Sequence, residues 1–212
     1  SHELRTPIAV IQGYAALLDR WGKDDPEALP ESIHAIRSEA KAMEELVEQL
    51  LFLARGDNDS MHIEMETFDL TEVAAEVLKE TGMIDQTHTF SARWEGAVPV
   101  CADVGLTKQA LRILVDNSIK YTPAGGHITL SAALRDGMAR LSVQDEGQGI
   151  DAGSLPHVFD RFFTSDKMRT GRNTGLGLAI VKALAGQMDC RAEAALEGDM
   201  FAITLRWPVE RR

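Results

Sequence analysis

The chain has 212 residues, of which 44% are apolar, so it is long enough for one large or two small domains with real cores. Its formal net charge is −11 and no stretch gathers Lys and Arg into a basic stripe, which argues against a nucleic-acid-binding surface. Cys101 and Cys190 lack the paired spacing of a disulfide or metal site, which fits a reducing compartment. Neither a signal peptide nor an apolar run of membrane-spanning length is present, so we expect this chain to be soluble.

The first helix is expected to run to a break at residues 21–26, because apolar residues recur along it at alternating steps of four and three. Near its start His2 and Thr6 share a helix face, and Glu3 flanks the imidazole. Pro7 cannot donate a backbone hydrogen bond, so the helix should be kinked or loosened just beyond His2. An exposed histidine beside a carboxylate is a candidate nucleophile. The simpler alternative is that Thr6 caps a helix beginning at Pro7, after a frayed terminus.

A second apolar seam follows, with the same heptad-like spacing. Its members are Ile33, Ile36, Ala40, Met43, Val47, Leu50 and Ala54. Gly56 offers a C-cap, and residues 56–60 form a polar hinge. Two helices joined by a short turn bury too little apolar surface to be stable alone, whereas two copies would form a four-helix bundle. We therefore expect a homodimer; the alternative is that the hairpin packs on its own downstream domain.

After the hinge the apolar period changes from helical to alternating, and residues 61–66 predict a half-buried strand. Asp69 and Glu72 predict a capping box at the start of the next helix. Residues 88–95 and 97–101 look extended. This succession of strands and helices already differs from the all-helical start of the chain, so a second domain is expected here.

The last third of the chain alternates strands and helices in the same way. We expect a helix from 104 to 117, strands at 128–134 and 141–145, short helical segments within 151–163, a helix at 175–187 and strands at 190–196 and 200–206. Asp103 can cap the first of these helices, and Asp136-Gly137 suits a tight hairpin turn. The pattern predicts an α/β sandwich, in which helices cover one face of a mixed sheet.

Asn117 continues the apolar stripe of its helix, so it should face inward, where an amide needs hydrogen-bond partners. Alone, it is best explained as a core asparagine satisfied by backbone groups. Lys120 and Tyr121 add a cation and an aromatic ring to the same side. An amide oxygen can bind Mg²⁺, lysine suits phosphate and tyrosine suits a base ring, so the three residues also fit a nucleotide site.

Residues 145–150 leave a strand and enter a glycine loop, which lets backbone approach a ligand. The Asp145 carboxylate could accept a hydrogen bond from an exocyclic amine, although an ordinary tight turn would look similar. A second glycine cluster precedes a helix whose N-terminus favours phosphate. Its members are Gly171, Gly175 and Gly177. Each signal is weak alone, but the three occur in one domain, in an order that would suit a site around one nucleotide.

Five motifs occur in order along nearly the whole chain. They are Ser-His-Glu-Leu-Arg-Thr-Pro at 1–7, Asp-Asn-Ser-Ile-Lys-Tyr-Thr-Pro at 116–123, Asp-Glu-Gly-Gln-Gly-Ile at 145–150, Phe-Asp-Arg-Phe-Phe at 159–163 and Thr-Gly-Leu-Gly-Leu-Ala-Ile at 174–180. On these motifs the chain resembles the catalytic core of a sensor histidine kinase of two-component signalling. In that family they correspond to the H, N, G1, F and G2 boxes.

The resemblance implies an α+β chain of two domains. Residues 1–56 would be a dimerisation and phosphotransfer hairpin that forms a dimeric four-helix bundle. Residues 57–61 would be a hinge. Residues 62–210 would be an ATP-binding domain of the Bergerat type, an α/β sandwich with a mixed sheet.

The same resemblance implies roles for individual residues. His2 would accept the γ-phosphoryl group of ATP, Glu3 would act as its orienting base and Thr6 would help remove the group again. Asn117 would hold Mg²⁺, and Asp145 would bind the adenine amine. The other residues implied at the ATP site are Lys120, Tyr121, Gly147, Gly149, Ile150, Arg161, Thr174, Gly175, Leu176 and Gly177.

Two positions depart from the family pattern. Residues 164–174 would form a lid over ATP, and Asn173 stands there where glycine is usual, so that turn would rest on the tolerance of asparagine for positive φ. Ile113 stands four residues before Asn117, where many relatives carry asparagine and related ATPases of the gyrase and Hsp90 type carry glutamate. The second departure bears on mechanism, because isoleucine cannot activate water.

We therefore expect a bifunctional histidine kinase that uses ATP and Mg²⁺ and acts on a response-regulator receiver domain. The alternatives are a plain ATPase, in which the hairpin only oligomerises, and a scaffold that binds nucleotide without catalysis. The first helix of the family is already under way at residue 1, so we expect an upstream segment. The expected location is cytoplasmic, with membrane attachment only through a segment outside this chain, and no nucleic-acid partner is expected.

Overall fold

The computed structural model describes residues 2–56, 62–147, 149–164, 174–198 and 200–209, with the backbone alone for residues 2, 3, 55 and 56. The chain separates into two compact units, residues 1–54 and residues 55–212. The hinge expected at residues 57–61 lies outside the described residues. Throughout the described ranges, every helix is too short or too polar to cross a membrane.

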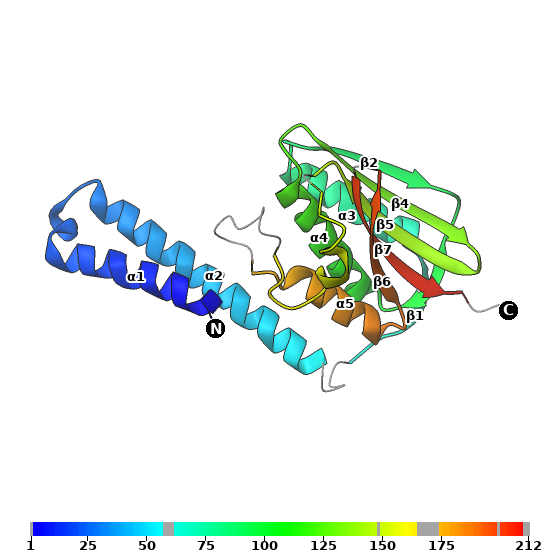
Figure 1. Ribbon diagram of the computed structural model, residues 1–212, viewed down its shortest axis with the longest axis horizontal. Helices are drawn as coiled ribbons and strands as arrows, with labels where there is room; N and C mark the ends of the chain where they lie inside the picture. Colours follow the sequence, from blue (N-terminus) through cyan, green and yellow to red (C-terminus); the bar gives the residue numbers. More distant parts are fainter. Residues whose placement is uncertain (1, 57–61, 148, 165–173, 199, 210–212) are drawn as a thin grey trace. The chain divides into compact units, whose positions relative to one another are not determined.

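The first unit is a helical hairpin (Figure 1). Its elements are α1 (His2–Arg20), the short 3-10 helix η1 (Gly22–Asp24) and α2 (Ala28–Gly56). Helix α1 already includes residues 2–5 and runs through Pro7, so Thr6 is not an N-cap and the frayed-terminus alternative is wrong. The Asp25 carboxylate accepts hydrogen bonds from the backbone N–H groups of Glu27 and Ala28, at 2.8 and 3.0 Å, and so starts α2.

The predicted seam of α2 divides into two rows of different exposure. Ile33 and Val47 remain 45% and 43% exposed, whereas Ile36 and Leu50 of the same seam are half-buried. Burial of a seam requires a facing surface along its whole width, and a single hairpin leaves one row of this seam open to solvent.

The second unit is a mixed sheet with helices on one face (Figure 1). Its strands are β1 (Glu66–Asp69), β2 (Thr89–Trp94), β3 (Pro99–Ala102), β4 (His127–Arg135), β5 (Met138–Asp145), β6 (Arg191–Glu197) and β7 (Met200–Pro208). Its helices are α3 (Leu70–Ile84), α4 (Val104–Tyr121), the 3-10 helix η2 (Leu155–His157) and α5 (Gly177–Gln187). The main sheet has the order β2-β4-β5-β7-β6, in which only β2 and β4 are parallel, while β1 pairs with β3. The expected α/β sandwich with a mixed sheet is confirmed.

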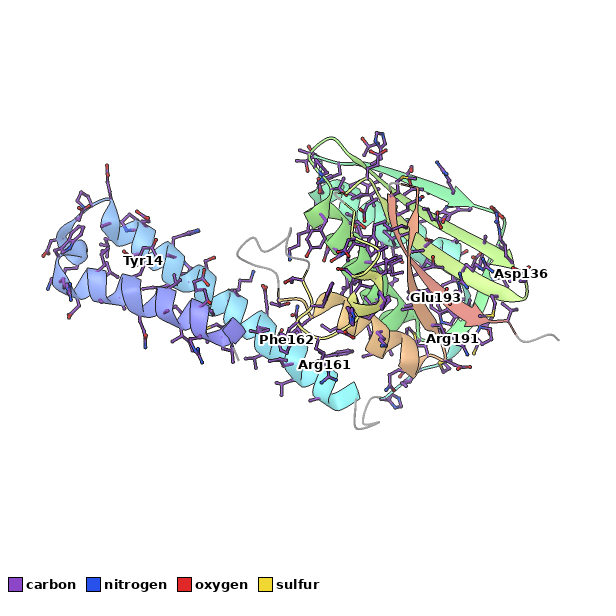
Figure 2. The ribbon with its side chains drawn as sticks, in the orientation of Figure 1. Tyr14, Asp136, Arg161, Phe162, Arg191 and Glu193 are labelled. Carbon is purple, nitrogen blue, oxygen red and sulfur yellow. The ribbon has the colours of Figure 1, made fainter. Side chains whose placement is uncertain are left out.

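The two faces of the sheet differ in chemistry. Along β5, buried and half-buried residues alternate strictly, and its buried side ends in Asp145. The other face is polar, with Arg206 of β7 paired to Glu193 of β6 at 2.9 Å. Figure 2 labels Glu193 and also Asp136, which stands with Gly137 at the β4–β5 turn. Both turn residues have positive φ, 54° and 72°, as a two-residue hairpin turn requires.

Local capping positions the helices that carry the site. Asp69 precedes α3, and its carboxylate accepts from the backbone N–H groups of Thr71 and Val98, at 2.9 and 3.0 Å. Asp103 precedes α4 and accepts from the N–H of Leu106 at 2.9 Å. Both helix starts are those expected from the sequence.

One expected element is displaced. The strand expected at residues 61–66 begins only at Glu66, because β3 pairs with residues 66–69 alone. Before that point the backbone N–H of Glu64 donates to the Asp103 carboxylate at 2.9 Å instead of to a neighbouring strand. Within residues 151–163, by contrast, the short 3-10 helix η2 lies where short helical segments were expected. A strand persists only where a partner supplies a ladder, which alternation of side chains does not reveal.

Candidate functional site

Helix α4 and the end of β5 meet at Asp145. The Asp145 side chain is buried, with the residue only 4% exposed. Its Oδ2 accepts from the Ser118 hydroxyl at 2.7 Å, and its Oδ1 accepts from the backbone N–H of Gly147 at 3.0 Å. Burial raises the pKa of Asp145, whereas these two hydrogen bonds act to lower it. The carboxylate is therefore held in one orientation at the base of the site.

Gly147 is required by a close approach between the loop after β5 and the end of α4. A β-carbon at this position would lie 2.7 Å from Asp145 Oδ1 and 3.0 Å from the carbonyl oxygen of Tyr121. Gly149 follows with φ of 67°, and Ile150 is half-buried. The glycine loop thus lets backbone pass directly against the helix that carries the other candidate residues.

The last turns of α4 present Asn117, Lys120 and Tyr121. Asn117 and Tyr121 are half-buried, and the Lys120 Nζ lies 5.9 Å from the centroid of the Tyr121 ring. Partial burial lowers the pKa of Lys120, which remains exposed at its surface, and raises the pKa of Tyr121. A cation, an aromatic ring and an amide thus lie on α4, the helix that also carries Ser118, the hydrogen-bond partner of Asp145.

Gly175 and Phe162 join the two ends of the segment before α5. The backbone N–H of Phe162 donates to the Gly175 carbonyl at 2.9 Å, and both residues have positive φ, 64° and 63°. A β-carbon at Gly175 would lie 2.6 Å from the carbonyl carbon of Phe162, so only glycine fits. Figure 2 shows Phe162 beside Arg161, which is exposed. The expected lid, including Asn173, lies outside the described residues except at its ends, Thr164 and Thr174.

The start of α5 lies against α4. Leu176 is fully buried, and its backbone N–H donates to the Thr174 hydroxyl at 3.4 Å. A β-carbon at Gly177 would lie 3.3 Å from Cγ2 of Ile113, so the first turn of α5 packs closely on the middle of α4. Helix α4 is therefore the element that brings the N, G1 and G2 motifs together.

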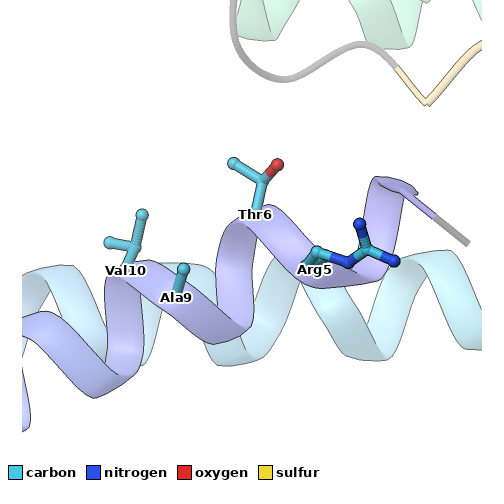
Figure 3. Close-up of a pocket in the computed structure, with 4 residues that line it drawn as sticks. All are labelled: Arg5, Thr6, Ala9 and Val10. Atoms are coloured by element: carbon cyan, nitrogen blue, oxygen red, sulfur yellow. The ribbon is translucent and has the colours of Figure 1, made fainter.

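The H-box residues belong to the other unit. Thr6 is exposed on α1 and lines an open pocket with Arg5, Ala9 and Val10 (Figure 3). His2 and Glu3 are part of α1, and their side chains lie outside the described residues.

Ser118 is the site residue that the sequence interpretation missed. It stands beside Asn117 on α4 and is buried, 3% exposed, with its hydroxyl on Asp145. A hydroxyl on the inward side of a helix that ends near a glycine loop was the available signal. Its partner lies 27 residues away, which spacing along the chain does not reveal.

The oxygen donors at the site suit a metal ion that is bound together with a phosphate ligand. In the described ranges no group of three or more His, Cys, Asp and Glu could hold a metal ion. Mg²⁺ commonly takes one or two protein oxygens and completes its shell with phosphate and water. The amide oxygen of Asn117 fits that pattern, and a preformed carboxylate cage does not exist among these residues.

Two family models match the chain. The His Kinase A (phospho-acceptor) domain matches residues 1–59, and the family of histidine kinase-, DNA gyrase B- and HSP90-like ATPases matches residues 102–211. Sensor histidine kinase YkoH of Bacillus subtilis is 41% identical over 189 residues, which are 88% of this chain and 41% of YkoH. Sensor histidine kinase TrcS of Mycobacterium tuberculosis is 36% identical over 195 residues, which are 87% of this chain and 37% of TrcS. The chain thus spans about two fifths of these relatives.

Solved structures show the same architecture. Histidine kinase AdeS of Acinetobacter baumannii matches with a TM-score of 0.75 and 26% identity, over 100% of this chain and 99% of that one. Histidine kinase ThkA, in complex with response regulator protein TrrA, matches with a TM-score of 0.78 and 26% identity, over 99% of this chain and 59% of that one. Taken with the family models, these similarities lead to one conclusion: the chain belongs to the histidine kinase, gyrase B and HSP90-like ATPase family and is the catalytic core of a two-component sensor histidine kinase.

Proposed function

We propose that the chain transfers the γ-phosphoryl group of ATP to His2 and then passes it to an aspartate of a response-regulator receiver domain. The observation that carries the proposal is that one chain holds both a phospho-acceptor hairpin and, in its other unit, a buried carboxylate hydrogen-bonded to α4, the helix that ends in a cation and an aromatic ring. The complex of ThkA with a response regulator supports the same class of partner. Residues 1–56 would serve transfer, residues 57–61 would be the hinge and residues 62–210 would bind ATP.

In this proposal the buried Asp145 carboxylate accepts a hydrogen bond from the adenine amine. Asn117 would hold Mg²⁺, which neutralises phosphate charge when bound, and Lys120 would contact phosphate. Tyr121, Gly147, Gly149, Ile150, Arg161 and residues 174–177 would complete the nucleotide contacts. Positioning and charge neutralisation supply most of the catalysis.

The chemical step forms a phosphorus–nitrogen bond. An imidazole nitrogen of His2 attacks the γ-phosphorus, the bond to the bridging oxygen breaks and ADP leaves, while Glu3 takes the ring proton. The test is incubation with ATP labelled at the γ-phosphate, followed by acid and alkali treatment of the labelled chain. Label that is lost in acid and kept in alkali supports phosphohistidine, and label that survives acid contradicts it.

We also propose that Thr6 assists removal of the phosphoryl group from the regulator, since its hydroxyl is exposed on α1 at an open pocket (Figure 3). Thr6→Ala should keep autophosphorylation and lose most of the dephosphorylation of a phosphorylated regulator, because the hydroxyl that orients water is gone. Thr6→Ser keeps a hydroxyl and should retain the activity. Release of labelled phosphate from the regulator measures both variants, and equal loss of kinase and phosphatase activity in Thr6→Ala would assign the residue a structural role.

The exposed row on α2 supports a homodimer through the hairpin, in which a second copy covers that row. Val47 is 43% exposed in the single chain and would be covered by the second copy in the dimer. Val47→Glu should therefore give monomers, because dimerisation would bury an unpaired charge. Leu50→Glu and Ile36→Glu should also give monomers, with local unfolding of the hairpin, since these residues are half-buried. Glu48→Lys, at an exposed position beside Val47, is the matched control. Sedimentation at micromolar concentration decides the matter, and a monomeric wild type would remove the proposal.

A further inference from the structure

His88 lies in the turn between α3 and β2, and its side chain is only 6% exposed. Its Nδ1 is 2.7 Å from Asp85 Oδ2, and its Nε2 is 3.0 Å from the Thr122 carbonyl oxygen. A carboxylate and a carbonyl can only accept hydrogen bonds, so both ring nitrogens must carry a proton to satisfy both partners. A neutral imidazole has one N–H and would leave one of these contacts between two acceptors. The Thr87 hydroxyl also lies 3.0 Å from Nδ1, but it donates to Asp85 Oδ1 at 2.7 Å, so the geometry selects the imidazolium.

This imidazolium acts on the end of the helix that carries the candidate site. Thr122 follows α4 directly as its C-cap, and a cation there is favourable because the last carbonyls of a helix lack backbone partners. Two backbone hydrogen bonds reinforce the contact, from Gly125 N–H to the Thr87 carbonyl at 2.8 Å and from Thr89 N–H to the Gly126 carbonyl at 3.0 Å. The turn around His88 thereby fixes the position at which α4 stops.

From Thr122 the chain of contacts leads straight into the site. Tyr121 precedes it, and the Tyr121 carbonyl lies against the space that Gly147 keeps free. Gly147 in turn donates its N–H to Asp145. A shift of the last turn of α4 would therefore move Lys120 and Tyr121 relative to the Asp145 carboxylate.

The charges around His88 are few. The Thr122 carbonyl raises the pKa of His88 most, Asp85 raises it further, and burial opposes both. The Thr87 hydroxyl and His88 hold the pKa of Asp85 at about 2, so its carboxylate is ionised at neutral pH. On the neighbouring strand β4, His127 pairs instead with Glu146 at 3.1 Å. Among the described residues, Asp85 is thus the one charged group that shifts the pKa of His88, and it raises that pKa.

We propose that protonated His88 is a positioning residue of the nucleotide site, which holds the last turn of α4 in the conformation that binds nucleotide. The inference rests on the proposed function, since it assumes that this unit binds nucleotide. The pKa of His88 is raised, so the proton is fully present below the ordinary histidine value and is lost as pH rises through the raised value. Nucleotide affinity should therefore fall as pH rises through that titration.

The test compares the full chain with His88→Gln and with His62→Gln, using ADP in calorimetric titrations from about pH 6 to pH 8.5. His62 pairs with Glu64 at 3.5 Å on an exposed surface, so it is a matched histidine–carboxylate control. The titration of ADP itself is common to all three proteins and cancels in their ratios. Wild type and His62→Gln should lose about fivefold or more in affinity over this range relative to His88→Gln. Parallel curves for wild type and His88→Gln would overturn the proposal.

Asp85→Asn provides a second test if His88→Gln does not fold. It keeps the imidazole and removes the carboxylate, so the pKa of His88 should fall and the pH midpoint of ADP affinity should fall with it. Ring-proton NMR resonances of His88 give that pKa directly. A midpoint that stays in place while the pKa moves would overturn the proposal. Failure of every protein to bind ADP at any pH would remove the proposed function itself, and the inference with it.

Discussion

His2→Gln should abolish phosphoprotein formation and nearly all ATP consumption, while nucleotide affinity stays almost unchanged. Glutamine keeps a polar side chain of similar length but offers no nucleophilic nitrogen. A hydrolase would also need a base that activates water near the γ-phosphate. The position of that base in related ATPases is held here by Ile113, whose Cγ2 lies against the first turn of α5 and cannot accept a proton. Asp116 is adjacent to Asn117 but points about 100° away around the helix.

The experiment measures three quantities on the same preparations: label retained on the chain, ADP released per minute and calorimetric affinity for ATP. His34→Gln is the matched control, because it changes an exposed histidine on the other helix of the same hairpin and should behave as wild type. Steady ADP release by His2→Gln at the wild-type rate would show that the histidine is not the acceptor that matters. The plain ATPase would then be the better description of the chain.

Asp145→Asn should weaken ATP binding by roughly ten- to a hundredfold with little change in folding. Both carboxylate oxygens of Asp145 accept from donors, the Ser118 hydroxyl and the Gly147 N–H. An amide would turn an NH₂ group toward one of these donors and would lose the acceptor that the adenine amine needs. Loss of a hydrogen bond to a buried charged group typically costs about 1.5–3 kcal/mol, which corresponds to this change in affinity. Folding should tolerate the change, since burial already disfavours the charge there.

Two further variants sharpen this result. Ser118→Ala removes only the hydroxyl that orients the carboxylate, so it should weaken ATP binding less than Asp145→Asn does. Asp136→Asn changes an exposed aspartate at the β4–β5 turn (Figure 2) and should bind ATP as wild type does. Calorimetric titration with ATP and thermal unfolding of each variant separate affinity from stability. Unchanged affinity in Asp145→Asn would place the adenine elsewhere.

Much of the fold could be predicted because it depends on contacts close along the chain. The helix starts follow from Asp69 and Asp103, whose carboxylates accept from N–H groups two and three residues on. The β4–β5 hairpin follows from Asp136-Gly137, since positive φ at both positions produces the turn. The mixed sheet follows from the order in which helical and alternating spacings of apolar residues succeed one another along the chain. The start of β1 was predicted too early, because its extent depends on pairing with β3, whose residues lie thirty or more positions away.

The sequence by itself determined the residue types of the site and their order, since each motif is a short run whose chemistry depends on its own side chains. Only the tertiary structure decided how these runs meet. Ser118 reaches Asp145 across 27 residues, and His88 reaches Thr122 across 34, because α4 packs on the sheet beside α3 and α5. Likewise, the α2 seam predicted apolar contact, but the hairpin determined which row remains exposed. Local pattern specifies which groups are available, whereas partners distant along the chain are chosen by packing.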